Sequence, residues 1–159
     1  MTTDTTILLP DAAATDALAS AVAPRLAAGD TLLLEGPVGA GKTAFARALI
    51  GARRARAGLP PEDVPSPTFT LVQTYDAGEV EIWHADLYRL TDPSEVLELG
   101  LDAAFEDAIC LIEWPDRLGP ATPPEAIRLT LATEGEGRIA TLRAPARTLA
   151  RLLPDRVTA

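Results

Sequence analysis

The eight residues from Gly36 to Thr43, GPVGAGKT, constrain the fold more than any other stretch of the chain. They match G-x-x-x-x-G-K-[ST], a loop whose glycines let backbone N–H groups turn inward around phosphate oxygens. Such a loop joins a buried strand to a helix. The apolar run over 31–36 predicts the strand, and the four-residue spacing of Phe45 and Leu49 predicts the helix. A glycine-rich turn that opens an ordinary helix is the alternative, but it explains neither the full pattern nor the two flanks.

Each position of this loop has an expected task. We expect Lys42 to reach the β- and γ-phosphates as a compact charge, and the Thr43 hydroxyl to bind Mg²⁺. The positive end of the following helix favours the same anion. The backbone that surrounds the phosphates is expected to come from Gly36, Gly39, Ala40 and Gly41.

Lys42 is the single lysine of the chain, which has thirteen arginines. Arginine therefore serves at every other basic position, but its broad planar fork does not replace a slim ammonium inside a tight phosphate cradle. The guanine-specific GTPases resemble one another in an Asn-Lys-x-Asp signature, which a chain without a second lysine cannot contain. The sequence therefore favours an adenine nucleotide.

Two carboxylates follow apolar strand patterns, where acids that act at a nucleotide are expected. Residues 108–112 form a buried-strand pattern that ends in Glu113, the position of a Mg²⁺-associated acid. His84 and Asp86 are two apart on a strand and face the same side, so Asp86 could hold a metal-bound or attacking water. The alternatives are a surface acid for Glu113, a salt bridge to Arg89 for Asp86, and packing or hydrogen bonding for His84, which we favour there over catalysis.

The hydroxyl-rich loop Ser66–Thr70, SPTFT, is placed like a switch that senses the nucleotide. Such loops close when a hydroxyl reaches Mg²⁺ or the γ-phosphate. Because SPT is also common in ordinary loops, the pattern alone leaves both interpretations open.

The remaining patterns predict one α/β domain over 1–159, with a mixed, mostly parallel sheet flanked by helices. Hydrophobic residues make up 47% of the chain, enough for a core. A proline-rich loop is expected over 59–68. We expect strands over 7–9, 31–36, 69–75, 79–87, 108–114, 127–132 and 138–144, and helices over 11–29 (capped by Asp11 and split at Pro24), 42–57, 93–100, 101–108 and 146–153.

Composition excludes several classes of protein. No apolar run approaches the ~18 residues that a membrane span needs, and an acid lies where a secretory signal has bases. The single Cys110 excludes an internal disulfide, so we expect a cytoplasmic protein. A net charge of −9 opposes tight binding of nucleic acid by the chain alone.

Four ordered motifs resemble those of the TsaE family: the phosphate loop, SPTFTLVQTY, HADLYRL and LIEWPDRL. The resemblance extends from Pro10 to the EGEGR hairpin. It implies a small bacterial P-loop ATPase that uses ATP and Mg²⁺ and works with two partners, of the TsaB and TsaD type. Together they would place a threonylcarbamoyl group on the adenosine beside the anticodon of tRNAs that read codons beginning with A, so this chain would meet tRNA only indirectly.

The resemblance also assigns roles to residues. It implies that Thr43 and Glu113 hold Mg²⁺, that Asp86 is needed for ATP turnover close to that metal, and that Thr68 belongs to the switch loop. The adenine would be enclosed by Asp11, Gly137 and Arg138.

Two features depart from the family's motifs. Pro24 interrupts the first helix, and Arg53, Arg54 and Arg56 match no motif. We interpret the three arginines as a solvated helix end favoured by the helix dipole, with contact to a partner or tRNA as the alternative.

Three hypotheses of function remain. The first is an ATPase that drives or resets a tRNA-modifying complex. The second is a small-molecule kinase of the P-loop class, opposed by the lack of an arginine-rich lid pattern. The third is a nucleotide-dependent binding module without productive turnover.

Overall fold

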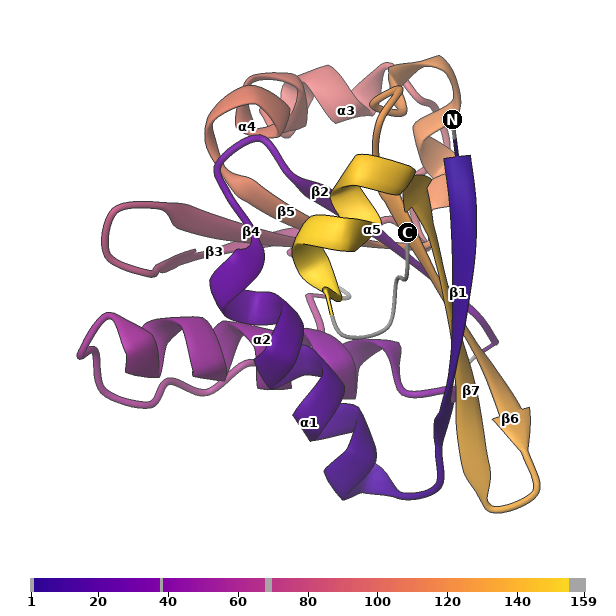
Figure 1. The fold of residues 1–159 in the computed structure, drawn as a ribbon. Coiled ribbons are helices and arrows are strands. Elements are labelled where there is room, and N and C mark those ends of the chain that lie inside the picture. The colour runs from indigo at the N-terminus through magenta and orange to yellow at the C-terminus, as the bar shows by residue number, and fades with distance from the viewer. Residues whose placement is uncertain (1, 38, 68–69, 155–159) are drawn as a thin grey trace.

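A seven-stranded mixed sheet lies at the centre of the molecule (Figure 1). The structure, a computed structural model, describes residues 2–37, 39–67 and 70–154. The sheet order is β1-β7-β6-β2-β5-β4-β3, with β6, β2, β5 and β4 parallel and the outer pairs antiparallel. This confirms the expected α/β sheet with a parallel centre. The strands are β1 (Thr2–Leu9), β2 (Thr31–Glu35), β3 (Val72–Asp76), β4 (Glu81–Asp86), β5 (Ile109–Glu113), β6 (Ile127–Glu134) and β7 (Gly137–Pro145).

Helical elements cover both faces of the sheet at β2, β5 and β4, with α1 and α2 on the side opposite α3 and α4 in Figure 1, whereas β6 and β1 keep one face toward solvent. Both faces of β2 are apolar, because successive side chains of a strand point to opposite faces and three leucines follow one another here. Leu32 and Leu34 pack with α1, α2 and α5, while Leu33 packs with α3, α4 and η2. None of the described helices is long and apolar enough to span a bilayer. The helical elements are α1 (Ala12–Val22), η1 (Ala23–Arg25), α2 (Lys42–Arg56), α3 (Glu95–Glu98), α4 (Leu101–Asp107), η2 (Pro115–Ala121) and α5 (Ala146–Leu152).

The first helix begins at its predicted cap and is split at Pro24 as expected, but its helical structure ends at Arg25 rather than at Gly29. Asp11 is its N-cap, and one carboxylate oxygen accepts a hydrogen bond of 2.9 Å from the Ala14 N–H. The α-helix ends at Val22, and a short 3₁₀ helix that contains Pro24 follows it. The proline therefore splits the helix, because it has no N–H to continue the α-helical hydrogen bonds.

The strand β1 is longer than the sequence predicts. Only residues 7–9 are apolar enough to indicate a strand, but β1 runs from Thr2 and pairs with β7 over its whole length. Its early residues alternate between exposed and partly buried, which is typical of an edge strand with one solvated face. Threonine, which favours strands, supplies the missing part.

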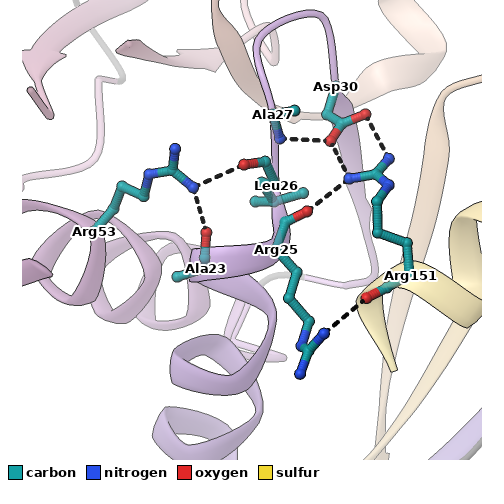
Figure 2. Close-up of polar contacts among 7 residues, drawn as sticks. All are labelled: Ala23, Arg25, Leu26, Ala27, Asp30, Arg53 and Arg151. Carbon is teal, nitrogen blue, oxygen red and sulfur yellow. Dashed lines mark hydrogen bonds and ion pairs between the residues drawn. The ribbon is translucent and has the colours of Figure 1, made fainter. Parts of the chain in front are cut away.

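The interpretation of the arginines at the end of α2 as a solvated cluster is wrong for two of the three. Arg53 donates hydrogen bonds of 2.7 Å to the carbonyls of Ala23 and Leu26 (Figure 2). Arg54 is buried and donates to the carbonyls of Asp76, at 2.6 Å, and Pro60, at 3.0 Å. Only Arg56 is exposed. The two arginines thus attach the end of α2 to η1, to the end of β3 and to the loops that follow η1 and α2.

The loop between η1 and β2 is also held from α5 (Figure 2). Arg151 forms a two-pronged contact with the Asp30 carboxylate, at 2.9 and 3.1 Å, and donates to the Arg25 carbonyl at 2.6 Å. The same carboxylate accepts the Ala27 N–H at 2.8 Å. Because this loop leads into β2, these contacts fix the start of the strand that carries the phosphate loop.

We expect Arg54→Met to lower the free energy of unfolding by about 2 kcal/mol, because two backbone carbonyls lose the charged donor of a buried side chain. Arg56→Met, on the same helix end but exposed, should change it by less than about 0.5 kcal/mol. Urea denaturation of both variants measures the difference. Equal stabilities would show that Arg54 is as dispensable as its solvated neighbour.

Candidate functional site

The phosphate loop connects β2 to α2, as its pattern requires. Gly36 has φ +141°, and a Cβ there would lie 2.4 Å from the Leu131 carbonyl oxygen of β6, so no larger residue fits. Gly41, with φ +104°, is the left-handed residue that opens α2 at Lys42. The glycines therefore let the loop pack against β6 and direct the start of α2 toward the expected phosphates.

Lys42 is folded against its own loop. Its Nζ donates to the Gly36 carbonyl at 2.5 Å and lies 3.9 Å from the centre of the Trp114 ring. Burial lowers the pKa of Lys42, and the nearby carboxylates of Glu113 and Asp86 oppose that shift. A buried ammonium that donates to one backbone carbonyl still has N–H groups with which to bind an anionic ligand.

Thr43 and Glu113 meet as the sequence analysis expects of a magnesium pair. The Thr43 Oγ1 lies 3.0 Å from each carboxylate oxygen of Glu113, from the first turn of α2 to the end of β5. Glu113 is only 3% exposed, so the alternative of a plain surface acid is wrong. A hydroxyl and a carboxylate held together at this point are the oxygen donors that Mg²⁺ prefers.

His84 is buried in β4 and contacts the same carboxylate. Its Nε2 lies 2.6 Å from Glu113 Oε2, and its side chain is fully buried. The hydrogen-bonding role that the sequence favours for this histidine is therefore what the structure shows.

Asp86 ends β4 directly beside Glu113, its register partner on β5. One of its oxygens accepts the Ser66 hydroxyl at 3.2 Å, and the other accepts the Tyr88 N–H at 3.1 Å. The expected switch loop thus reaches the carboxylate through Ser66. Thr68, the residue that the sequence analysis places in the switch, lies outside the described residues.

A cavity of about 470 Å³ brings these groups together. Its wall includes two aromatic rings that the sequence left without a role, Tyr88 and Trp114, whose centroids are 5.0 Å apart. Trp114 has φ +58°, so the chain turns sharply where β5 ends. An aromatic residue directly after the strand-end acid is the signal that could have indicated this wall. The lining residues are Gly39, Gly41, Lys42, Thr43, Ala44, Ser66, Asp86, Tyr88, Glu113 and Trp114.

A second cavity of about 300 Å³ lies beside the first and shares Gly41 and Ala44 with it. The three residues expected around the adenine, Asp11, Gly137 and Arg138, line it together with Ala40. Arg138 ties the β6–β7 hairpin to the phosphate loop, because it donates to the carbonyls of Ala40 and Gly39 at 3.1 Å each. The arrangement suits a base at the second cavity and phosphates at the first.

The donor chemistry fits a nucleotide with Mg²⁺. Within the described part of the chain, no group of three or more histidine, cysteine, aspartate or glutamate side chains could hold a metal alone. Mg²⁺ commonly binds through one or two protein oxygens and completes its shell with water and phosphate. Thr43 and Glu113 supply such a pair, and Asp86 lines the same cavity.

Comparisons with known proteins show what the chain as a whole is similar to. A family model described as "Threonylcarbamoyl adenosine biosynthesis protein TsaE" matches residues 9–140. The chain is 36% identical over 136 residues to the tRNA threonylcarbamoyladenosine biosynthesis protein TsaE of Rickettsia felis, which covers 83% of this chain and 75% of that protein. The Bacillus subtilis protein of the same name is 36% identical over 126 residues, or 77% of this chain and 73% of its own. A crystal structure of YdiB from B. subtilis superimposes with a TM-score of 0.77 at 27% identity and covers 95% of this chain and 93% of that one.

Proposed function

The chain belongs to the TsaE family of threonylcarbamoyl adenosine biosynthesis proteins, and we propose that it is a Mg²⁺-dependent ATPase. Its hydrolysis of ATP would support the placement of a threonylcarbamoyl group on the adenosine next to the anticodon in tRNA. The single observation that carries the proposal is the cavity that gathers Lys42, Thr43, Asp86 and Glu113 next to a phosphate loop. We further propose that the protein acts in the cytoplasm.

The phosphate end of the site would be bound by the loop and Lys42. The turned backbone of the loop offers its N–H groups, and Lys42 would exchange the Gly36 carbonyl for phosphate oxygens. Thr43 and Glu113 would hold Mg²⁺, which neutralises charge on the β- and γ-phosphates when bound. The lining of the second cavity, with Asp11, Gly137 and Arg138, would enclose the adenine.

Asp86 would act on the attacking water. It lies at the strand end next to Glu113, is 6% exposed, and lines the phosphate cavity. A carboxylate there can orient a water, or accept its proton, directly or through the metal's hydration shell. Release of inorganic phosphate from ATP, measured with and without the partner proteins, tests the activity. Binding of ATP without release in either condition would favour the nucleotide-dependent binding module instead.

The partners would be two proteins of the TsaB and TsaD type, which together transfer the threonylcarbamoyl group. The net charge of −9 opposes tight binding of tRNA by this chain alone, because that affinity depends on neutralising phosphates. Contact with tRNA would therefore run through the complex. Ser66, which already reaches Asp86, would couple the loop to the nucleotide.

We expect the partner pair to bind this chain at least tenfold more tightly with a non-hydrolysable ATP analogue than with ADP. The γ-phosphate and Mg²⁺ would order the Ser66–Thr70 loop, and the partner would recognise the ordered surface. Calorimetry with the analogue, with ADP, and with Thr68→Ala plus the analogue measures this difference.

Arg56→Ala, at the exposed end of α2, is the matched control and should bind like the wild type. Equal affinity in all states would refute the switch. Tight, salt-sensitive binding of tRNA by the isolated chain would refute the indirect contact with tRNA.

A further inference from the structure

We infer that His84 is a positioning residue, which holds the Glu113 carboxylate in the orientation that faces Thr43. Three groups from three elements meet here: His84 of β4, Glu113 of β5 and Thr43 of α2. The 2.6 Å contact from His84 Nε2 reaches the same Oε2 that lies 3.0 Å from the Thr43 hydroxyl. The inference rests on the proposed function, because it assigns a task toward the Mg²⁺ that Thr43 and Glu113 would hold.

The geometry assigns the proton of the imidazole to Nε2. An ionised carboxylate only accepts hydrogen bonds, so the ring nitrogen that contacts Glu113 must be the donor. Nδ1 is buried and has no hydrogen-bond partner among the described residues. A buried N–H without an acceptor costs more than a buried lone pair, so a proton on Nε2 alone satisfies the ring best.

The hydrogen bond matters because the carboxylate is buried and has few other constraints. Glu113 is 3% exposed, and the described hydrogen bonds to its carboxylate come from Thr43 and His84. Thr43 approaches both oxygens at 3.0 Å, so its hydroxyl alone does not select which oxygen faces which way. The hydrogen bond from His84 to Oε2 restrains rotation of the carboxylate, while both of its oxygens lie 3.0 Å from the Thr43 hydroxyl. Groups that hydrogen-bond a metal ligand in this way typically change metal affinity ten- to hundredfold.

Two substitutions at His84 test this positioning. Glutamine can place its amide nitrogen near the position of Nε2, whereas the shorter asparagine reaches only about as far as Nδ1. We expect His84→Asn to weaken binding of Mn²⁺, a paramagnetic probe, to the ADP-bound protein ten- to hundredfold, as measured by electron paramagnetic resonance. Its affinity for ADP without metal should stay within about twofold of the wild type, and His84→Gln should recover most of the Mn²⁺ affinity.

Ile82→Ala is the matched control for a purely structural effect. Ile82 is also fully buried in β4, two residues before His84 and on the same side of the strand, but it packs in the core. It should destabilise the fold and leave the affinity for Mn²⁺ unchanged. Wild-type Mn²⁺ affinity in His84→Asn, or an equal loss in Ile82→Ala, would overturn the inference. Failure of the wild type itself to bind Mn²⁺ with ADP would instead refute the proposed function.

The wild-type protein offers a second readout if the variants do not fold. His84 is the only histidine of the chain, so a long-range ¹H–¹⁵N spectrum contains the ring nitrogens of this residue alone. We expect one protonated and one unprotonated nitrogen, with the protonated signal shifting when Mg²⁺ is added to the ADP-bound protein. An unprotonated Nε2, or no response to Mg²⁺, would contradict the assigned role.

Discussion

Lys42→Ala is expected to abolish ATP turnover, and Lys42→Arg should fail nearly as badly although it keeps the charge. The ammonium lies between the Gly36 carbonyl, at 2.5 Å, and the centre of the Trp114 ring, at 3.9 Å. Lys42 as a whole is only 6% exposed. A planar guanidinium is wider and cannot occupy that space without displacing the loop or the ring. Loss of a charged donor aimed at the transferring phosphate costs a hundredfold or more in rate.

Phosphate release and binding of a fluorescent ATP analogue measure the effect of both variants. Arg56→Lys is the matched control, because it makes the opposite exchange at an exposed position of the same helix and should leave turnover unchanged. Wild-type activity in Lys42→Arg would show that the chain keeps its single lysine for another reason.

The positions of the strand-end acids could be predicted because they follow from short-range patterns. The apolar runs before Glu113 and Asp86 predict buried strands, and parallel neighbours bring their carboxyl ends to one edge. The phosphate loop defines its own flanking strand and helix. For these elements the local sequence and the fold agree, and the register Asp86 to Glu113 aligns the two acids.

The arginines of α2 show what local patterns omit. Their interpretation as a solvated helix end uses only the helix and its dipole. The acceptors of Arg53 are carbonyls in η1 and the loop after it, and those of Arg54 lie in β3 and the proline-rich loop. No periodicity indicates such pairs, because backbone carbonyls occur at every residue. Only the packing of α2 against these segments selects the acceptors.

The contact between His84 and Glu113 was unpredictable for a related reason. The sequence places His84 and Asp86 on one side of β4, but it does not give the register of β4 on β5. With Leu111 opposite His84, the imidazole reaches forward to the next residue of β5 on the same face, which is Glu113. A shift of one residue would turn the acid to the other face of the sheet.

Glu113→Gln and Asp86→Asn are expected to lower ATP hydrolysis by about a hundredfold or more while the fold survives. Each substitution removes a charge and keeps the shape of the side chain. The amide introduced by Glu113→Gln would retain a carbonyl oxygen for the Thr43 hydroxyl or for His84, but it would bind Mg²⁺ weakly because it is neutral. In Asp86→Asn the Ser66 hydroxyl keeps an acceptor, so the loop should stay in place while water activation is lost.

Steady-state phosphate release separates these effects from stability when it is combined with thermal unfolding of the same samples. Asp102→Asn, an exposed acid on α4, is the matched control and should keep both wild-type rate and wild-type stability. The two variants should also differ from each other, because raising the concentration of Mg²⁺ should partly restore Glu113→Gln but not Asp86→Asn. If either variant unfolds below the temperature of the assay, its carboxylate holds the fold together, and a structural interpretation of that acid replaces the catalytic one.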